Sequence, residues 1–262
     1  MQNKYLAWTL FILLLLILFA ASALLSLSSG EAAIGLKDIP SVLGDKEQME
    51  YYILTQIRMP RIILALAVGG SLSLAGAILQ GIYRNPLVEP YTLGISGGAA
   101  LGVALTIVSG LHLTLGTLIL PLSGFTGAAI VILIVGVLGF FRGGSNVNKM
   151  LLIGVMISFV ASSAMMFLMS ISSADNVYSI VFWIMGSLNE PNQVLIRITL
   201  FASLVGLAIS YLFARPLNAL MLGQEKAAYL GINSKNTIRM LFILSSLLTG
   251  ISVAVAGVIG FV

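Results

Sequence analysis

The sequence contains no cysteine and only one histidine, and these absences exclude several kinds of site. Without cysteine there is no disulfide framework, thiolate metal site or thiol nucleophile. A single histidine cannot build a histidine metal cluster, and His112 lies in the short stretch LHLTL, where a solvated or interfacial role is expected. No serine has the histidine or lysine partner that nucleophilic catalysis requires. The sequence therefore predicts neither an enzyme nor a bound metal or cofactor.

Charge is equally scarce. Charged residues make up 8% of the 262 residues and apolar residues 59%, whereas an ordinary soluble domain carries roughly 25% charged residues. No run of five or more like charges occurs, so the net charge of +4 does not indicate a nucleic-acid surface. No G-x-x-x-x-G-K-[ST] motif is present, and we expect no ATP binding by this chain alone. The composition indicates an integral membrane protein embedded in a lipid bilayer.

Long apolar runs predict an all-α, polytopic bundle of about seven transmembrane helices. The predicted spans are Leu6–Leu27, Ile62–Ile82, Leu93–Val108, Leu115–Phe141, Met150–Ile171, Leu195–Phe213 and Met240–Val262. The first run could be a signal peptide, but it is long and lacks a convincing cleavage site, so a retained helix is expected. Ser179–Leu188 is too short to span and is expected to form an interfacial or re-entrant helix at the outer rim.

The distribution of basic residues favours a cytoplasmic amino terminus. With that orientation, eight lysines and arginines fall inside and five outside, in agreement with the positive-inside rule. The inner residues are Lys4, Arg84, Arg142, Lys149, Arg215, Lys226, Lys235 and Arg239, and the outer ones are Lys37, Lys46, Arg58, Arg61 and Arg197.

Small residues repeat every four positions on two consecutive spans. Gly94, Gly98 and Gly102 share one helix face, and Gly69 begins a similar row with Ser73 and Ala77. In lipid, close backbone approach and van der Waals contact hold helices together. These glycines are therefore predicted to pack helices, although a pore-lining role leaves the same pattern.

No acidic or basic residue occupies the middle of a predicted span. Carriers driven by protons or sodium generally need such intramembrane groups. Energy must then come from another polypeptide, or the chain is a passive conduit.

The segment Arg215–Arg239, between the sixth and seventh predicted spans, is a candidate for that input. Pro216 is expected to stop the incoming helix, Asn218 to cap a short helix through Ala219–Leu230, and Gly231 to end it. Leu220, Ala227 and Leu230 would form its apolar stripe. Such a helix could lie on the membrane or bind a cytoplasmic partner, and both interpretations stay open.

Three segments carry a family resemblance. They are the block from Arg58 to Gly102, with R-x-P-R followed by N-P-L-x-x-P-x-x-L-G-I-S-x-G-A, then LGQEKAAYLGI, and the closing LLTGISVAVAGVIGFV. Together they resemble the FecCD-like permease subunits of type II ABC importers, which take up iron-siderophores, haem and cobalamin. The resemblance covers nearly the whole chain and implies one permease domain over residues 1–262, with a cytoplasmic coupling segment at 216–236.

The resemblance assigns roles to matching positions. Arg58 and Arg61 would dock a substrate-binding protein at the outer rim, although they could simply anchor the helix end. The cytoplasmic gate would comprise Asn85, Pro86, Leu87, Val147 and Asn148. The ATPase-coupling residues would be Leu222, Gly223, Gln224, Glu225, Ala228, Leu230 and Gly231.

The implied assembly is an ATP-driven importer in a bacterial or archaeal inner membrane. It would contain a second permease subunit, identical or different, a cytoplasmic ABC ATPase pair and an extracytoplasmic binding protein. The cargo would be an iron-siderophore or a related metal chelate, and ATP hydrolysis would occur on the ATPase. Relatives generally continue past G-F-V with three further helices, ten in all, so the chain is expected to be a fragment or a natural truncation. The alternatives are a passive channel or secondary carrier without an ATPase and, with little support, a membrane-embedded enzyme.

Overall fold

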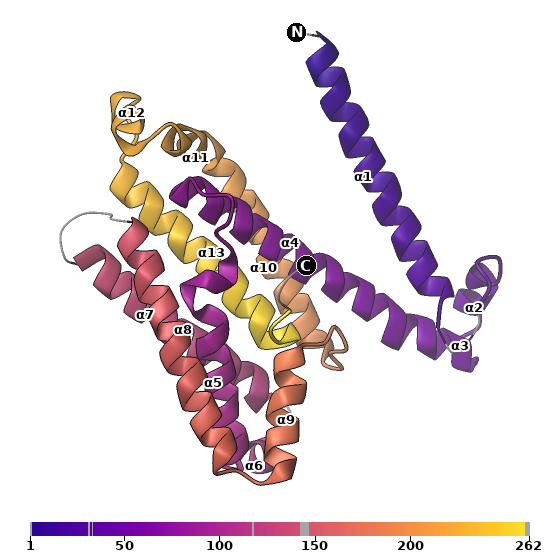
Figure 1. Ribbon diagram of the computed structural model, residues 1–262. Coiled ribbons are helices and arrows are strands. Elements are labelled where there is room, and N and C mark those ends of the chain that lie inside the picture. Colours follow the sequence, from indigo (N-terminus) through magenta and orange to yellow (C-terminus); the bar gives the residue numbers. More distant parts are fainter. Residues whose placement is uncertain (1, 31, 33, 117, 142–146, 260–262) are drawn as a thin grey trace. The chain divides into compact units, whose positions relative to one another are not determined.

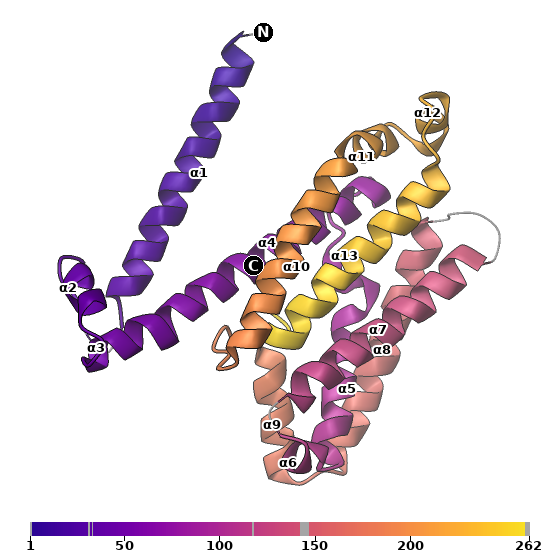
Figure 2. The same ribbon diagram turned by 180° about the vertical axis from the view of Figure 1, so that it is seen from behind.

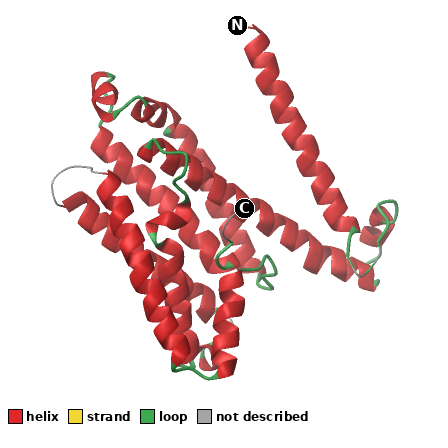
Figure 3. Ribbon diagram, in the orientation of Figure 1, coloured by secondary structure: helices red, strands yellow, loops and turns green. Residues whose placement is uncertain are grey.

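The computed structural model describes residues 2–30, 32, 34–116, 118–141 and 147–259. Arg142 and the last three residues of the predicted span Met240–Val262 lie outside this part of the chain. Within it, every regular element is a helix (Figure 3). The described chain forms two compact units, residues 1–65 and 66–262.

The first unit begins with one long apolar helix, α1 (Gln2–Ser28). A loop with two short helices, α2 (Ile39–Gly44) and α3 (Met49–Tyr52), leads into a π-helical turn, η1 (Ile53–Arg58). The next helix, α4 (Met59–Tyr83), begins here and continues into the second unit. A small core of Ile34, Val42 and Leu54 joins the loop to η1.

The second unit holds the remaining helices. They are η2 (Pro90–Leu93), α5 (Ile95–Val108), α6 (Leu111–Thr114), α7 (Ile119–Phe141), α8 (Val147–Ser170), α9 (Ala174–Met185), α10 (Gln193–Leu212), α11 (Ala214–Met221), α12 (Gln224–Tyr229) and α13 (Ser234–Ala256). Figures 1 and 2 show α11 and α12 at one end of this unit and α6 at the other, beside the turn from α8 to α9. The main core joins residues of α4, η2, α5, α7, α8, α11 and α13.

Six described helices are long and apolar enough to cross a membrane. They are Leu6–Ser28, Met49–Tyr83, Ile119–Phe140, Val147–Ser170, Gln193–Leu212 and Ser234–Ala256. These confirm six of the seven predicted spans.

The one predicted span that is not among these six is Leu93–Val108. It is wrong as a full span, because the helix found there, α5, has only 14 residues. At a rise of 1.5 Å per residue such a helix covers about 21 Å, less than the roughly 30 Å of a hydrocarbon core. Gly94 adopts φ +79° and separates η2 from α5, so this segment is not one continuous helix. Val88, Pro90 and Leu93 are buried, which fits the rule that irregular backbone at membrane depth is enclosed by protein.

The short helix α9 confirms the prediction that Ser179–Leu188 does not belong to a full span. Its 12 residues begin at the Ser173 cap, whose side chain accepts a hydrogen bond from the Asn176 N–H. It ends at Gly186, whose φ of +71° lets the backbone approach the end of α13. There the Ser187 N–H donates to the Ala256 carbonyl over 2.8 Å.

Helix α13 is the most enclosed of the six spans and carries a row of buried hydroxyls. Ser245, Thr249 and Ser252 donate to carbonyls of the preceding turn, at 3.0, 2.8 and 2.8 Å. Because these bonds stay within the helix, the small side chains can be buried without leaving their hydroxyls unpaired.

Candidate transport and coupling sites

The turn after α4 is held by local hydrogen bonds. The Asn85 side chain accepts a hydrogen bond from the Leu87 N–H at 3.0 Å, and Gln80 Nε2 donates to the Pro86 carbonyl at 3.2 Å. An Asx turn of this kind mimics a backbone turn and fixes its geometry. Leu87 is 81% exposed at its tip. The predicted gate residues Asn85, Pro86 and Leu87 thus form a defined projection with an apolar tip.

The other predicted gate residues lie at the start of α8. Val147 packs against the main core, whereas Asn148 is exposed. Residues 142–146, just before them, lie outside the described chain. The start of α8 and the end of α4 both lie at the end of the second unit that carries α11 and α12 (Figure 1).

The segment after α10 differs from the predicted single helix Ala219–Leu230. It consists of two short helices, α11 and α12, separated at Gly223, where φ is +113°. The incoming helix α10 ends at Leu212, four residues before Pro216, and Pro216 lies in the first turn of α11, a position where proline is tolerated. Asn218 lies inside α11 and caps nothing. The predicted helix is wrong because a left-handed glycine interrupts it.

The predicted end of this segment at Gly231 is confirmed. Gly231 has φ +77° and donates its N–H to the Ala228 carbonyl over 2.9 Å. The Ile232 N–H donates to the Ala227 carbonyl over 3.0 Å. This pair of bonds is a Schellman motif, which closes the carboxyl end of α12.

The break at Gly223 also changes which side chains are presented. Leu220 and Ala227 are buried as predicted, but Leu230, the third member of the expected stripe, is exposed. Three apolar residues are exposed, Leu222 after α11 and Tyr229 and Leu230 at the end of α12, and Tyr229 is 91% exposed. We call these three residues the coupling surface, after the role predicted for the segment. The sequence analysis did not single out Tyr229, because it assumed one continuous helix, on which Tyr229 lies outside the expected apolar stripe.

The remaining predicted coupling residues lie around this surface. Ala228 and Glu225 are exposed, and the Gln224 carbonyl accepts a hydrogen bond from the Ser234 hydroxyl at 3.2 Å. This bond ties the start of α12 to the start of α13. The coupling surface is therefore attached to the most enclosed helix of the unit.

The two predicted docking arginines occupy different environments in the first unit. Arg58 is only 8% exposed, and its guanidinium donates to the backbone carbonyls of Leu27 and Ala32. Arg61 is exposed. Arg58 thus has the contacts of an anchor that holds the loop after α1, whereas Arg61 lies at the surface.

Three of the four predicted packing glycines lie at close helix contacts. A Cβ on Gly98 would meet Val131 and would lie 2.7 Å from the Gly127 carbonyl oxygen on α7. A Cβ on Gly102 would lie 2.5 Å from the Ser123 carbonyl oxygen, and one on Gly94 would lie 2.6 Å from that of Gly154 on α8. A side chain at any of these positions would collide with backbone.

Gly69 is different, and its predicted packing role is wrong within the described chain. The space that its Cβ would fill is open to 4 Å, and Ser73 and Ala77 on the same face are exposed. The close position is Gly70, where a Cβ would lie 3.1 Å from the Ser203 hydroxyl of α10. Adjacent helical residues point about 100° apart, so the pattern was misplaced by one residue.

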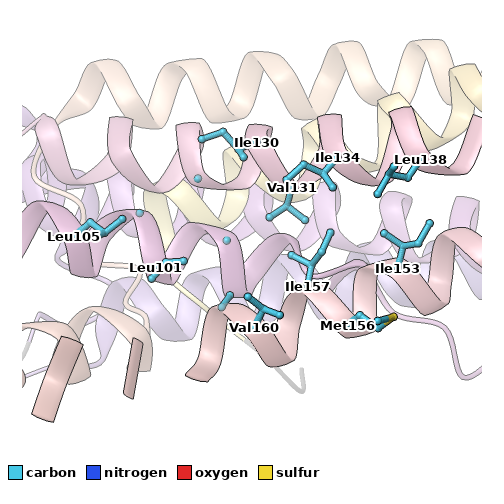
Figure 4. Close-up of a pocket in the computed structure, with 14 residues that line it drawn as sticks. Leu101, Leu105, Ile130, Val131, Ile134, Leu138, Ile153, Met156, Ile157 and Val160 are labelled. Atoms are coloured by element: carbon cyan, nitrogen blue, oxygen red, sulfur yellow. The ribbon is translucent and has the colours of Figure 1, made fainter. Parts of the chain in front are cut away.

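An apolar groove of about 540 Å³ runs between α5, α7 and α8 (Figure 4). Gly98, Gly102 and Gly127 contribute backbone to it, and branched side chains line the remainder. The labelled lining residues in Figure 4 are Leu101, Leu105, Ile130, Val131, Ile134, Leu138, Ile153, Met156, Ile157 and Val160. This groove offers shape and apolar contact but no charged or hydrogen-bonding side chain.

Few ionisable groups are perturbed outside the spans. Burial raises the pKa of the Glu190 carboxyl in the loop between α9 and α10, and the Asn192 N–H, which donates to Glu190 Oε1 at 2.8 Å, opposes this rise. No group of three or more histidine, aspartate or glutamate side chains suited to a metal ion occurs among the described residues.

Comparison with known proteins adds a family match. The FecCD transport family matches residues 13–262. The hemin transport system permease protein HmuU of Yersinia pestis is 36% identical over 251 residues, covering 95% of this chain and 74% of that protein. The vitamin B12 import system permease protein BtuC of Salmonella paratyphi A is 32% identical, covering 100% of this chain and 76% of that protein.

An ABC transporter permease protein of Bacillus subtilis, YvrB, is 36% identical over 84% of this chain. The chain spans 63% of the length of YvrB and about three quarters of the other two permeases. A solved structure of a metal-chelate type ABC transporter in an inward-facing conformation matches with a TM-score of 0.81 and 28% identity, covering 95% of this chain and 78% of that one.

Proposed function

The chain belongs to the FecCD transport family of ABC transporter permeases, and from this premise we propose that it forms the pathway of an ATP-driven importer of a metal chelate. The importer would sit in the inner membrane of a bacterial or archaeal cell. A second permease subunit would complete the pathway, a cytoplasmic ABC ATPase pair would drive it, and an extracytoplasmic binding protein would deliver the cargo. The expected cargo is an iron-siderophore. Haem and cobalamin are the alternative cargoes, because similar permeases are named for their transport.

The coupling surface is the observation that carries this proposal. The coupling surface consists of three apolar side chains that are each exposed: Leu222, Tyr229 and Leu230. The helix that carries Tyr229, α12, ends in a Schellman motif and is hydrogen-bonded to the start of α13. Exposed aromatic and aliphatic side chains on a rigid element are typical of protein contact sites. This arrangement favours a protein partner over a helix that merely rests on the membrane.

The described spans also favour an external energy source. In five of the six spans, any charged residue lies near an end. In the longer helix Met49–Tyr83, Arg58 and Arg61 precede the stretch Ile62–Ile82, which contains no Asp, Glu, Lys or Arg. Ion-coupled carriers place such groups within the membrane. A permease that is moved by ATPase subunits needs none.

Binding of the ATPase tests the docking assignment. We would purify the permease in mild detergent and titrate it with the ABC ATPase of its own host. Tyr229→Ala should weaken the affinity about tenfold, since loss of a contact hot spot costs roughly 1–2 kcal/mol. Tyr178→Ala is the matched control, because Tyr178 is also exposed but lies on α9, outside the coupling surface. Equal weakening by both variants, or by neither, would show that the coupling surface does not dock the ATPase.

The proposed outer docking site has its own test. Arg58 is only 8% exposed whereas Arg61 is exposed, so the contact with the binding protein is expected to depend chiefly on Arg61. Arg61→Glu should slow association at low salt, because rim charges act mainly on the encounter rate. An unchanged association rate would leave both arginines as structural anchors.

A further inference from the structure

Arg84 is the one non-glycine residue with a left-handed backbone among the described residues, with φ +51°. It lies between the end of α4 at Tyr83 and the Asx turn that begins at Asn85. A non-glycine residue in this region is uncommon and persists where surrounding structure requires it. The local turn does not explain why an arginine, with its long charged side chain, occupies the position.

The Arg84 side chain reaches the break between α11 and α12. A Cβ built on Gly223 would lie 3.5 Å from Arg84 Nη1, so the end of the Arg84 side chain lies beside Gly223. Gly223 directly follows the carboxyl end of α11 and donates its N–H to the Leu220 carbonyl over 2.9 Å. A cation is favoured at the carboxyl end of a helix, where the last carbonyls carry partial negative charge.

A second contact joins the same two segments one turn earlier on α4. A Cβ on Gly81 would lie 2.7 Å from Leu217 Cδ1 and 3.1 Å from its Cγ. The Leu217 side chain of α11 therefore rests directly on the α4 backbone. Two contacts, Arg84 to Gly223 and Leu217 to Gly81, thus link α11 and its junction with α12 to the helix end that carries the gate turn.

We propose that Arg84 is a positioning residue that transmits movement of the α11–α12 segment to the Asn85–Leu87 gate turn. The contact between Leu217 and Gly81 would transmit the same movement through α4. This role rests on the proposed function, since the movement would come from an ATPase bound at the coupling surface. The linkage is short, because Arg84 precedes the gate turn directly and its guanidinium lies beside Gly223, in the segment that the ATPase would move. Coupling by direct contact between two elements is a physical mechanism and needs no longer pathway.

The absence of cysteine makes the movement measurable. Leu87→Cys would place the only thiol among these 262 residues at the exposed tip of the turn, for attachment of an environment-sensitive fluorophore. The labelled permease would be assembled with its host ATPase in proteoliposomes, and the fluorescence change on adding a non-hydrolysable ATP analogue would be recorded. This signal needs no cargo.

Arg84→Gly removes the side chain while keeping the left-handed backbone accessible, so the turn should still form. The expected result is a fluorescence change that is smaller by roughly twofold or more, the range of couplings altered by such substitutions. Adding Leu217→Ala should abolish it. Arg84→Lys should restore part of the signal. Arg215→Ala is the matched control, because this exposed arginine of α11 carries the same charge.

Three results would overturn the proposal. One is a full signal in the double variant Arg84→Gly, Leu217→Ala with the ATPase still bound. Another is an equal loss in Arg215→Ala, which would indicate a general charge effect. The third is loss of ATPase binding in Arg84→Gly, which would make Arg84 part of the docking surface itself. Failure of the ATPase to bind the permease labelled at Leu87→Cys alone would instead refute the proposed function, before any other variant is made.

Discussion

Two adjacent glycines of α5 allow the packing of the bundle to be tested with a built-in control. Gly97 and Gly98 lie in the same helix, so changing either to alanine raises helix propensity by the same roughly 0.8–1 kcal/mol. A Cβ on Gly97 would meet Ala161 Cβ at 3.4 Å, an ordinary contact. A Cβ on Gly98 would meet Val131 and the carbonyl oxygen of Gly127, which lies 2.7 Å away.

The difference between the two variants isolates the steric cost. Overpacking costs about 1–3 kcal/mol, and the upper part of this range applies because the Gly127 oxygen is backbone and cannot rotate away. We therefore expect Gly98→Ala to have a free energy of unfolding about 2–3 kcal/mol lower than Gly97→Ala. This corresponds to a population of the unfolded state about 30- to 150-fold higher.

Unfolding in mixed micelles of mild detergent and dodecyl sulfate, followed by tryptophan fluorescence, would measure this difference. Trp183 reports on the bundle, since it packs against both α5-containing cores. If Gly98→Ala proved as stable as Gly97→Ala, the close contact between α5 and α7 would not exist, and the role given to the small-residue row would be wrong.

Three further predictions concern the loops. Because burial raises the pKa of Glu190, the folded state holds its proton more tightly; stability should fall as pH rises from about 4.5 through the folded pKa, and Glu190→Gln should remove this slope in thermal unfolding. Arg58→Met should cost several kcal/mol, since each hydrogen bond to a charged donor contributes about 1.5–3 kcal/mol, and should speed proteolysis of residues 34–48. Gly231→Val should cost at least about 1–2 kcal/mol in thermal unfolding because of its left-handed φ, while Gly231→Asn, a residue that tolerates this conformation, should cost less.

Hydropathy alone located the long helices because the bilayer sets their length and composition. It failed at Leu93–Val108, where Gly94 is both a helix-packing residue and the site of a backbone break. Glycine is compatible with either role, and a composition window cannot distinguish them. Gly223 shows the same ambiguity. The backbone break at this glycine separates α11 from α12, and Tyr229 therefore lies on a different helix face than a continuous helix would give it.

Contacts between segments that are distant in the sequence could not be predicted from the residue pattern either. The Arg58 guanidinium donates hydrogen bonds to the carbonyls of Leu27 and Ala32, which lie 31 and 26 residues earlier in the chain. The contact of Arg84 with Gly223 depends on how α11 turns away from α10. Motif spacing predicted a gate turn and a coupling segment, and both assignments stay predictions. The side chains that lie between these two segments could be found only from the fold.

The energy dependence of uptake tests the central claim most directly. The permease produced from its own gene would be reconstituted in liposomes with its ATPase and binding protein, and entry of a radiolabelled iron-siderophore would be measured with and without ATP. The account predicts accumulation that requires hydrolysable ATP and that falls with Tyr229→Ala at ATPase concentrations below the weakened Kd. Entry of the chelate at the same rate without ATP or the ATPase would contradict it and establish a passive channel or secondary carrier.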